Sequence, residues 1–131
     1  MRWSLRAAAA AAVLAPLLGA CTENGAGADL GGEYRGVVES PFFNEGAAVV
    51  ELEGPGLLEV TSAMPLFWAT TEGEVTRLVL INDPDGNGGP LTFRVVMEEG
   101  FGPPTGTVVE VVDGEDRPRD FIETYRVNFT R

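Results

Sequence analysis

The sequence has no histidine, no lysine and a single cysteine, Cys21. Without an imidazole or an amine there is no ordinary general base to activate a serine hydroxyl, so nucleophilic catalysis is not expected. One cysteine excludes both an internal disulfide and a metal cluster held by several thiolates. These absences predict a protein that is not an enzyme.

Positive charge is also scarce in this chain. Nine arginines stand against 20 acidic residues, which gives a formal net charge of -11. Nucleic-acid binding needs basic patches that displace counterions, so nucleic acid is not expected as a partner. Adhesion of the folded part to anionic lipid is not expected for the same reason. The acidic balance favours solubility of the folded part.

The longest apolar run, Ala7 to Leu18, is too short to cross a bilayer. As a helix it would reach only about 18 Å, whereas the hydrocarbon core is about 30 Å thick. Arg2 and Arg6 precede the run, Pro16 interrupts it, and small residues follow it. This pattern predicts a secretory signal peptide over residues 1–20 and an exported protein.

The residues that close this signal, Leu18-Gly19-Ala20-Cys21, resemble the lipobox of bacterial lipoproteins. The resemblance implies that the Cys21 thiol carries a diacylglyceryl group and that the chain is cut just before Cys21. It also implies anchoring of the acylated protein, by chains such as palmitate, in a cell membrane or an outer membrane. Thr22 is not the aspartate of an inner-membrane retention signal, so the outer membrane is favoured where there is one.

Beyond Cys21 the sequence divides into a tether and one small domain. Residues 21–32 hold the lipidated cysteine and a Gly-rich stretch without periodicity, which predicts a flexible tether. Residues 33–131 alternate apolar and polar side chains and keep no helical period over three turns. We expect an all-β domain, a small antiparallel β-barrel or sandwich of about seven strands. The expected strands are 34–39, 50–53, 58–61, 75–82, 91–98, 108–112 and 124–130.

The alternation also predicts which side chains face the core. In residues 91–98, one face is apolar and Arg94 points to the other. The apolar residues of three strands are expected to line the core: Leu91, Phe93, Val95 and Met97; Tyr125, Val127 and Phe129; and Leu58 and Val60. Residues 78–81 are continuously apolar, which is typical of a more central strand.

The start of the β-domain, Gly32-Glu33-Tyr34-Arg35-Gly36, resembles the opening of the lipocalins. Lipocalins open with Gly-x-Trp and pack that ring against an arginine of the last strand. The resemblance implies that Tyr34 takes the place of the Trp, with Arg126 or Arg131 as its partner. It also implies a barrel in which the first and last strands meet. The chain is shorter than a lipocalin, and no C-terminal helix follows the last strand.

Asp83, Asp85 and Asn87 have the spacing of the first half of a calcium loop. An EF-hand would need a glutamate where this chain has Arg94, so that motif is not present. Two interpretations stay open. The segment is either a calcium site in a hairpin or a hairpin loop whose residues suit the backbone angles of a turn. No other metal or cofactor is expected.

Two clusters of large apolar side chains break the alternation, Phe42-Phe43 and Phe67-Trp68. They would rim the mouth of the domain and bind a small apolar ligand, form a patch for a protein partner, or cap the core. The sequence therefore favours a membrane-anchored envelope lipoprotein with a non-enzymatic β-domain that binds a small apolar ligand or an envelope protein. The alternatives are a structural or assembly accessory without a small ligand, and a calcium-binding β-domain.

Overall fold

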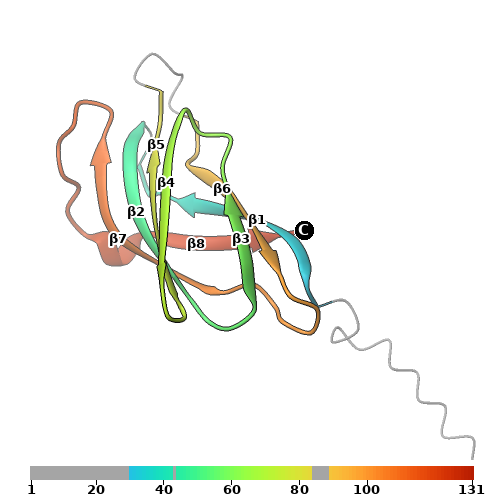
Figure 1. Ribbon diagram of the computed structural model, residues 1–131. Helices are drawn as coiled ribbons and strands as arrows, with labels where there is room; N and C mark the ends of the chain where they lie inside the picture. The colour runs from blue at the N-terminus through green and yellow to red at the C-terminus, as the bar shows by residue number, and fades with distance from the viewer. Residues whose placement is uncertain (1–29, 43, 84–88) are drawn as a thin grey trace, which may run out of the picture.

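The computed structural model describes residues 30–42, 44–83 and 89–131 (Figure 1). Cys21, with the expected signal peptide and most of the expected tether, lies outside the described residues. In the described part of the chain, no helix combines the length and the apolar character needed to cross a membrane. The elements are β1 (Gly32–Glu39), β2 (Glu45–Glu53), β3 (Leu57–Thr61), β4 (Leu66–Glu72), β5 (Val75–Ile81), β6 (Thr92–Met97), β7 (Thr105–Asp113), the short 3-10 helix η2 (Ile122–Thr124) and β8 (Arg126–Thr130).

The strands form two four-stranded antiparallel sheets, with the orders β3-β6-β1-β8 and β4-β5-β2-β7. Figure 1 shows β8 lying across the direction of β2, β4 and β5. The prediction of an all-β antiparallel domain is confirmed. The two sheets do not close into a barrel, so the sandwich alternative is the right one. The barrel implied by the lipocalin resemblance is wrong.

The first and last strands do meet. β1 lies between β6 and β8, and Val38 is paired with Val127 across the β1–β8 ladder. The guanidinium of Arg131 lies 4.8 Å from the centre of the Tyr34 ring and donates a hydrogen bond of 2.9 Å to its hydroxyl. The ring-to-arginine contact is therefore present with Arg131. Arg126 binds backbone carbonyl oxygens near its own strand instead.

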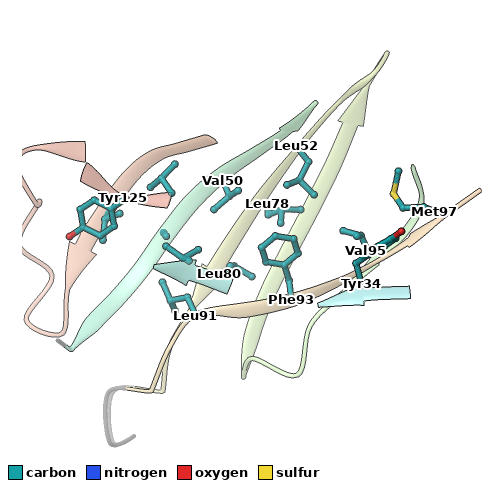
Figure 2. Packing of buried hydrophobic residues seen from close by; sticks show 14 residues of the cluster. Tyr34, Val50, Leu52, Leu78, Leu80, Leu91, Phe93, Val95, Met97 and Tyr125 are labelled. Carbon is teal, nitrogen blue, oxygen red and sulfur yellow. The ribbon is translucent and has the colours of Figure 1, made fainter. Parts of the chain in front are cut away.

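The core lies between the two sheets and follows the alternation of the sequence (Figure 2). Arg94 points outward, whereas its apolar neighbours on β6 are buried. One polar side chain in the core, Thr76, shares a hydrogen bond of 2.8 Å with the Thr71 hydroxyl. The buried apolar residues are Tyr34, Val38, Ala48, Val50, Leu52, Leu78, Leu80, Leu91, Phe93, Val95, Met97, Val108, Val111 and Tyr125.

Two details of the strands differ from the sequence-based prediction. The described residues hold an eighth strand, β4, which begins directly after Pro65 and pairs with β5. In β3, a register shift between Leu57 and Glu59 turns Leu58 away from the core. Leu58 is 65% exposed, while Leu57 and Val60 pack against the core, so the prediction of a core-facing Leu58 is wrong.

Candidate functional site

A pocket of about 460 Å³ lies at the end of the sandwich where β1 turns into β2. Its wall contains the polar residues Glu39, Ser40, Asn44 and Glu45, together with Gly89. The pocket surface is nevertheless mainly apolar. The apolar residues of the wall are Val37, Val38, Phe42, Pro90 and Leu91.

The local backbone explains why Phe42 lies at this pocket. The Val38 amide donates a hydrogen bond of 3.0 Å to the Leu91 carbonyl, which holds the end of β1 beside the wall of the pocket. The Phe42 amide then donates a bond of 2.9 Å to the Ser40 hydroxyl and tightens the turn. Asn44 adopts a left-handed backbone conformation with φ of 66°, which asparagine tolerates better than most residues, just before β2 begins.

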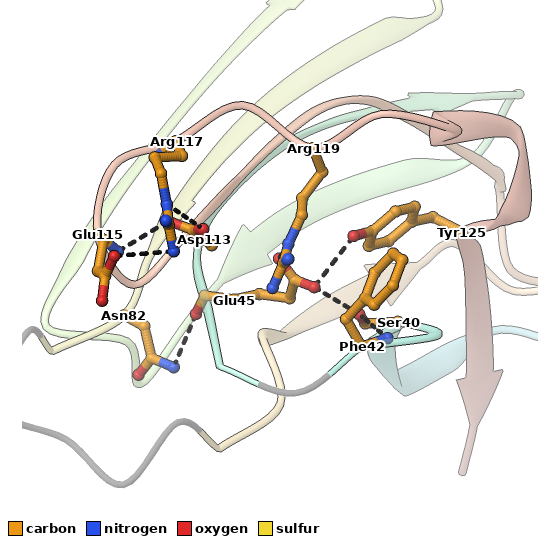
Figure 3. A network of polar contacts seen from close by, with 9 residues as sticks. All are labelled: Ser40, Phe42, Glu45, Asn82, Asp113, Glu115, Arg117, Arg119 and Tyr125. Atoms are coloured by element: carbon orange, nitrogen blue, oxygen red, sulfur yellow. Dashed lines mark hydrogen bonds and ion pairs between the residues drawn. The ribbon is translucent and has the colours of Figure 1, made fainter.

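A buried carboxylate, that of Glu45, forms the centre of a polar cluster beside the pocket (Figure 3). Its side chain is 7% exposed. The hydroxyls of Ser40 and Tyr125 donate hydrogen bonds of 2.6 and 3.0 Å to its Oε1. The Nε of Arg119 donates a bond of 3.1 Å to Oε2. Both carboxylate oxygens are thus satisfied, as a buried anion requires.

The contacts of the cluster shift the pKa of two of its members, Tyr125 and Arg119. Burial raises the pKa of Tyr125; Ser40 opposes this, and the hydrogen bond and charge of Glu45 add to it, so the phenol stays a neutral donor. Burial alone would lower the pKa of Arg119, but the hydrogen bond and charge of Glu45 outweigh burial and raise it. Arg119 is therefore a permanent cation paired with Glu45.

Arg119 also joins the cluster to the pocket wall. Its guanidinium carbon lies 4.7 Å from the centre of the Phe42 ring, a cation–π contact. Phe42 is 44% exposed, so this contact holds a ring that would otherwise be free to move at the surface. Because Glu45 already accepts three hydrogen bonds from within the protein, we expect the cluster to shape the pocket.

A second carboxylate, that of Asp113, organises the turn after β7. Its Oδ1 accepts hydrogen bonds of 2.8 and 3.0 Å from the amides of Glu115 and Arg117, and its Oδ2 accepts one of 3.0 Å from the Arg117 side chain. The bond from the Arg117 amide is the largest cause of a lowered Asp113 pKa; burial opposes it, and the other donors add to it. The turn precedes Arg119 and so helps to place it.

The structure separates the aromatic residues that the sequence grouped as a ligand site. Phe42 lies in the pocket wall, in the loop between β1 and β2, whereas Phe67 and Trp68 lie on β4. Phe67 packs against the core. Trp68 points to the opposite side of the strand and is 54% exposed. Phe43 lies outside the described residues. No common mouth is formed by the three aromatic residues that the structure describes.

The residues expected to bind calcium are described only in part. Asp83 is exposed after the end of β5, and its amide binds the side chain of Asn82 at 3.0 Å. Asp85 and Asn87 lie outside the described residues. Within the ranges that are described, no group of three or more acidic or cysteine side chains is placed to hold a metal ion. The calcium site stays a prediction.

Sequence reasoning missed the Glu45 cluster. Ser40 and Glu45 lie in one short stretch of the chain and Arg119 and Tyr125 in another, and only the fold brings the two stretches together. The position of Glu45 also departs from the alternation of β2, because a register shift between Glu45 and Ala47 places it among the buried residues. No local signal in the sequence indicates this.

No protein-family model matches the chain, and neither does any curated protein or solved structure. The pocket, its wall and the cluster beside it therefore carry the functional argument.

Proposed function

We propose that this protein is a non-enzymatic envelope lipoprotein, anchored through acylated Cys21, whose β-sandwich binds a small, mainly apolar molecule in the pocket beside Phe42. The pocket carries this proposal. Its volume of about 460 Å³ is in the range of small-molecule sites, and its wall is mainly apolar with a few polar groups. The signal peptide and lipobox patterns of residues 1–21 support the anchoring.

The charges around the pocket narrow the chemistry of the ligand. Glu39 and Glu45 contribute carboxylates to the wall, and the chain as a whole has a formal net charge of -11. An anionic ligand would be repelled by this field. Glu45 is already paired with Arg119 and two hydroxyls, so it does not need a cation from the ligand. A neutral molecule with a large apolar part fits best.

A titration with the neutral fluorescent probe N-phenyl-1-naphthylamine tests the proposal. Emission should rise as the probe leaves water. Phe42→Ala removes the aromatic wall and Val37→Thr makes another part of the wall polar. Each should weaken probe binding about fivefold to tenfold, corresponding to roughly 1 kcal/mol of lost apolar contact.

Val96→Thr is the matched control, because Val96 is also half-buried and lies on β6 outside the pocket wall. Its probe affinity should equal that of the wild type. Two results would show that the pocket is not a ligand site. Either Phe42→Ala, Val37→Thr and Val96→Thr all bind the probe as the wild type does, or neither the wild type nor any of these variants binds it.

A further inference from the structure

The two outer faces of the sandwich differ in chemistry. On the β3-β6-β1-β8 sheet, one row of neighbouring residues reads Thr61, Arg94, Arg35 and Thr130 across the strands. Arg94 also forms an ion pair of 2.9 Å with Glu33 on this face. This face is mainly polar and charged, and its outward apolar residues Leu58, Val37 and Val96 lie singly on three different strands.

The β4-β5-β2-β7 sheet has an apolar outer face at one end. Leu66 is 60% exposed and Trp68 is 54% exposed, both on β4. Each is aligned with outward, half-buried apolar residues on β5 and β2. We call this set the outer apolar face; it consists of Leu66, Trp68, Val79, Ile81, Ala47 and Val49.

The residues of the outer apolar face lie on the side of the sheet that points away from the core. In β5 the side chains of Leu78 and Leu80 are completely buried in the core. Val79 and Ile81 alternate with them along the strand, so they point away from the core. A contiguous exposed apolar patch rimmed by polar residues is uncommon on a monomer and is typical of an interaction surface. Tryptophan is among the residues enriched at the centres of such surfaces.

The rim of the outer apolar face is acidic. Glu110 continues the row of Trp68, Val79 and Val49 across the sheet, and Glu51 lies in the next row. Among the described outward residues of β4, β5, β2 and β7, Arg77 is the only base, and it is ion-paired with Glu51 at 2.6 Å. Negative charge is therefore in excess around the apolar centre.

We propose that the outer apolar face binds a protein partner whose own surface has an apolar centre and a basic rim. Charge complementarity selects this occupant. A second copy of the chain would bring two acidic rims together, and an anionic lipid surface would also be repelled. This partner site is separate from the pocket beside Phe42 and does not depend on a ligand there.

A photo-crosslinking amino acid at Thr70, which lies beside Trp68 on the outward side of β4, locates the partner in intact cells that make the full lipoprotein. The same amino acid at Thr130, on the outer face of the other sheet, is the control. We expect one protein to be crosslinked from Thr70 and not from Thr130. That protein is then purified and titrated into the lipoprotein by calorimetry.

The titration decides the proposal. Val79→Thr and Trp68→Thr should each weaken binding about tenfold or more, whereas Val96→Thr and the pocket variant Val37→Thr should bind as the wild type does. Glu110→Gln should weaken binding and reduce its salt dependence, and the exposed Glu59→Gln on the other sheet should do neither. Thermal melting checks that each variant is folded; if Trp68→Thr does not fold, Val79→Thr decides alone.

Three results would overturn the proposal. If the amino acid at Thr70 crosslinks to a second copy of this chain or to lipid, the occupant of the face is not the proposed protein partner. No crosslink, or equal crosslinks from Thr70 and Thr130, would mean that the face is not a docking surface. Unchanged affinity in Val79→Thr would mean that the partner binds elsewhere. Failure of the probe titration at the pocket would leave this proposal standing.

Discussion

Tyr125 and Glu45 show how single residues hold the pocket end of the sandwich. Tyr125 is 3% exposed, and its hydroxyl reaches the Glu45 carboxylate from the other end of the chain. The hydroxyl of Ser40 and the guanidinium of Arg119 bind the same carboxylate, so two distant stretches of the chain meet at one buried anion. Loss of any one donor leaves that anion less well solvated.

Tyr125→Phe should therefore lower the free energy of unfolding by about 1 to 2 kcal/mol at neutral pH, because a hydrogen bond to a charged group is lost. Urea denaturation followed by Trp68 emission measures this value. The folded pKa of Tyr125 lies above its ordinary value of 10.0, so the stabilisation is complete below pH 10. The stabilisation is lost as the pH rises through the folded pKa of Tyr125. In that pH range the difference in free energy of unfolding between the wild type and Tyr125→Phe should therefore narrow. A difference that stays constant above pH 10 would contradict the account.

Asp113→Asn should lower the denaturation midpoint at neutral pH, because the charge that accepts the hydrogen bonds of Glu115 and Arg117 is lost. The pKa of Asp113 is lowered from its ordinary value of 3.8, so its contribution is fully present above pH 3.8 and is lost as the pH falls through the folded pKa. The wild-type and variant midpoints should converge below pH 3.8. Asp120→Asn, at an exposed position, is the control for the loss of one negative charge.

At the scale of the element, close packing between strands constrains the sheet β3-β6-β1-β8. Gly36 on β1 is paired with Phe93 on β6, and the Phe93 ring lies over the glycine. The same ring meets Phe129 of β8 edge to face, with 5.8 Å between the ring centres. The glycine thus lets an aromatic ring connect three neighbouring strands.

Gly36→Ala should destabilise the protein by about 1 to 3 kcal/mol, because the added methyl group overlaps the Phe93 ring in a packed core. The denaturant midpoint measures the effect. Gly89→Ala is the matched control, since a methyl group there meets nothing within 4 Å. Equal midpoints for the two variants would show that the Phe93 ring moves aside without cost.

Strands could be predicted where the alternation was regular, and predictions failed where the backbone departed from it. The apolar face of β6 follows from the alternation, and the meeting of the first and last strands was implied by the lipocalin resemblance; both are confirmed. β4 was missed because Met64 and Pro65 obscure its start. Leu58 was placed wrongly because a register shift, which depends on the neighbouring strand, reverses its direction.

The candidate site was harder to predict than the fold. Phe42 was identified from its aromatic character and does lie in the pocket wall. Glu45, Arg119 and Tyr125 were not, because charged or aromatic side chains on strands and in loops are usually solvent-facing or part of the core. Their meeting depends on how the strands and loops of the two sheets are arranged in space, which no local pattern contains.

At the scale of the whole molecule, the acidic sandwich is expected to be held at a membrane by its lipid alone. Cys21→Ser removes the thiol that would be acylated, so the variant should leave the membrane fraction and appear as soluble protein. Because the core lies within residues 30–131, its melting temperature should equal that of the wild-type domain. Continued sedimentation of Cys21→Ser with membranes at high salt would contradict the anchoring.

Native mass spectrometry of the lipoprotein extracted from its own envelope tests the central claim most directly. We predict a chain that begins at Cys21, carries covalent acyl groups and retains a non-covalent small molecule, and we predict that Val37→Thr with Phe42→Ala loses this molecule while Val96→Thr keeps it. An uncleaved and unacylated chain, or identical ligand-free spectra for all these proteins, would contradict the account.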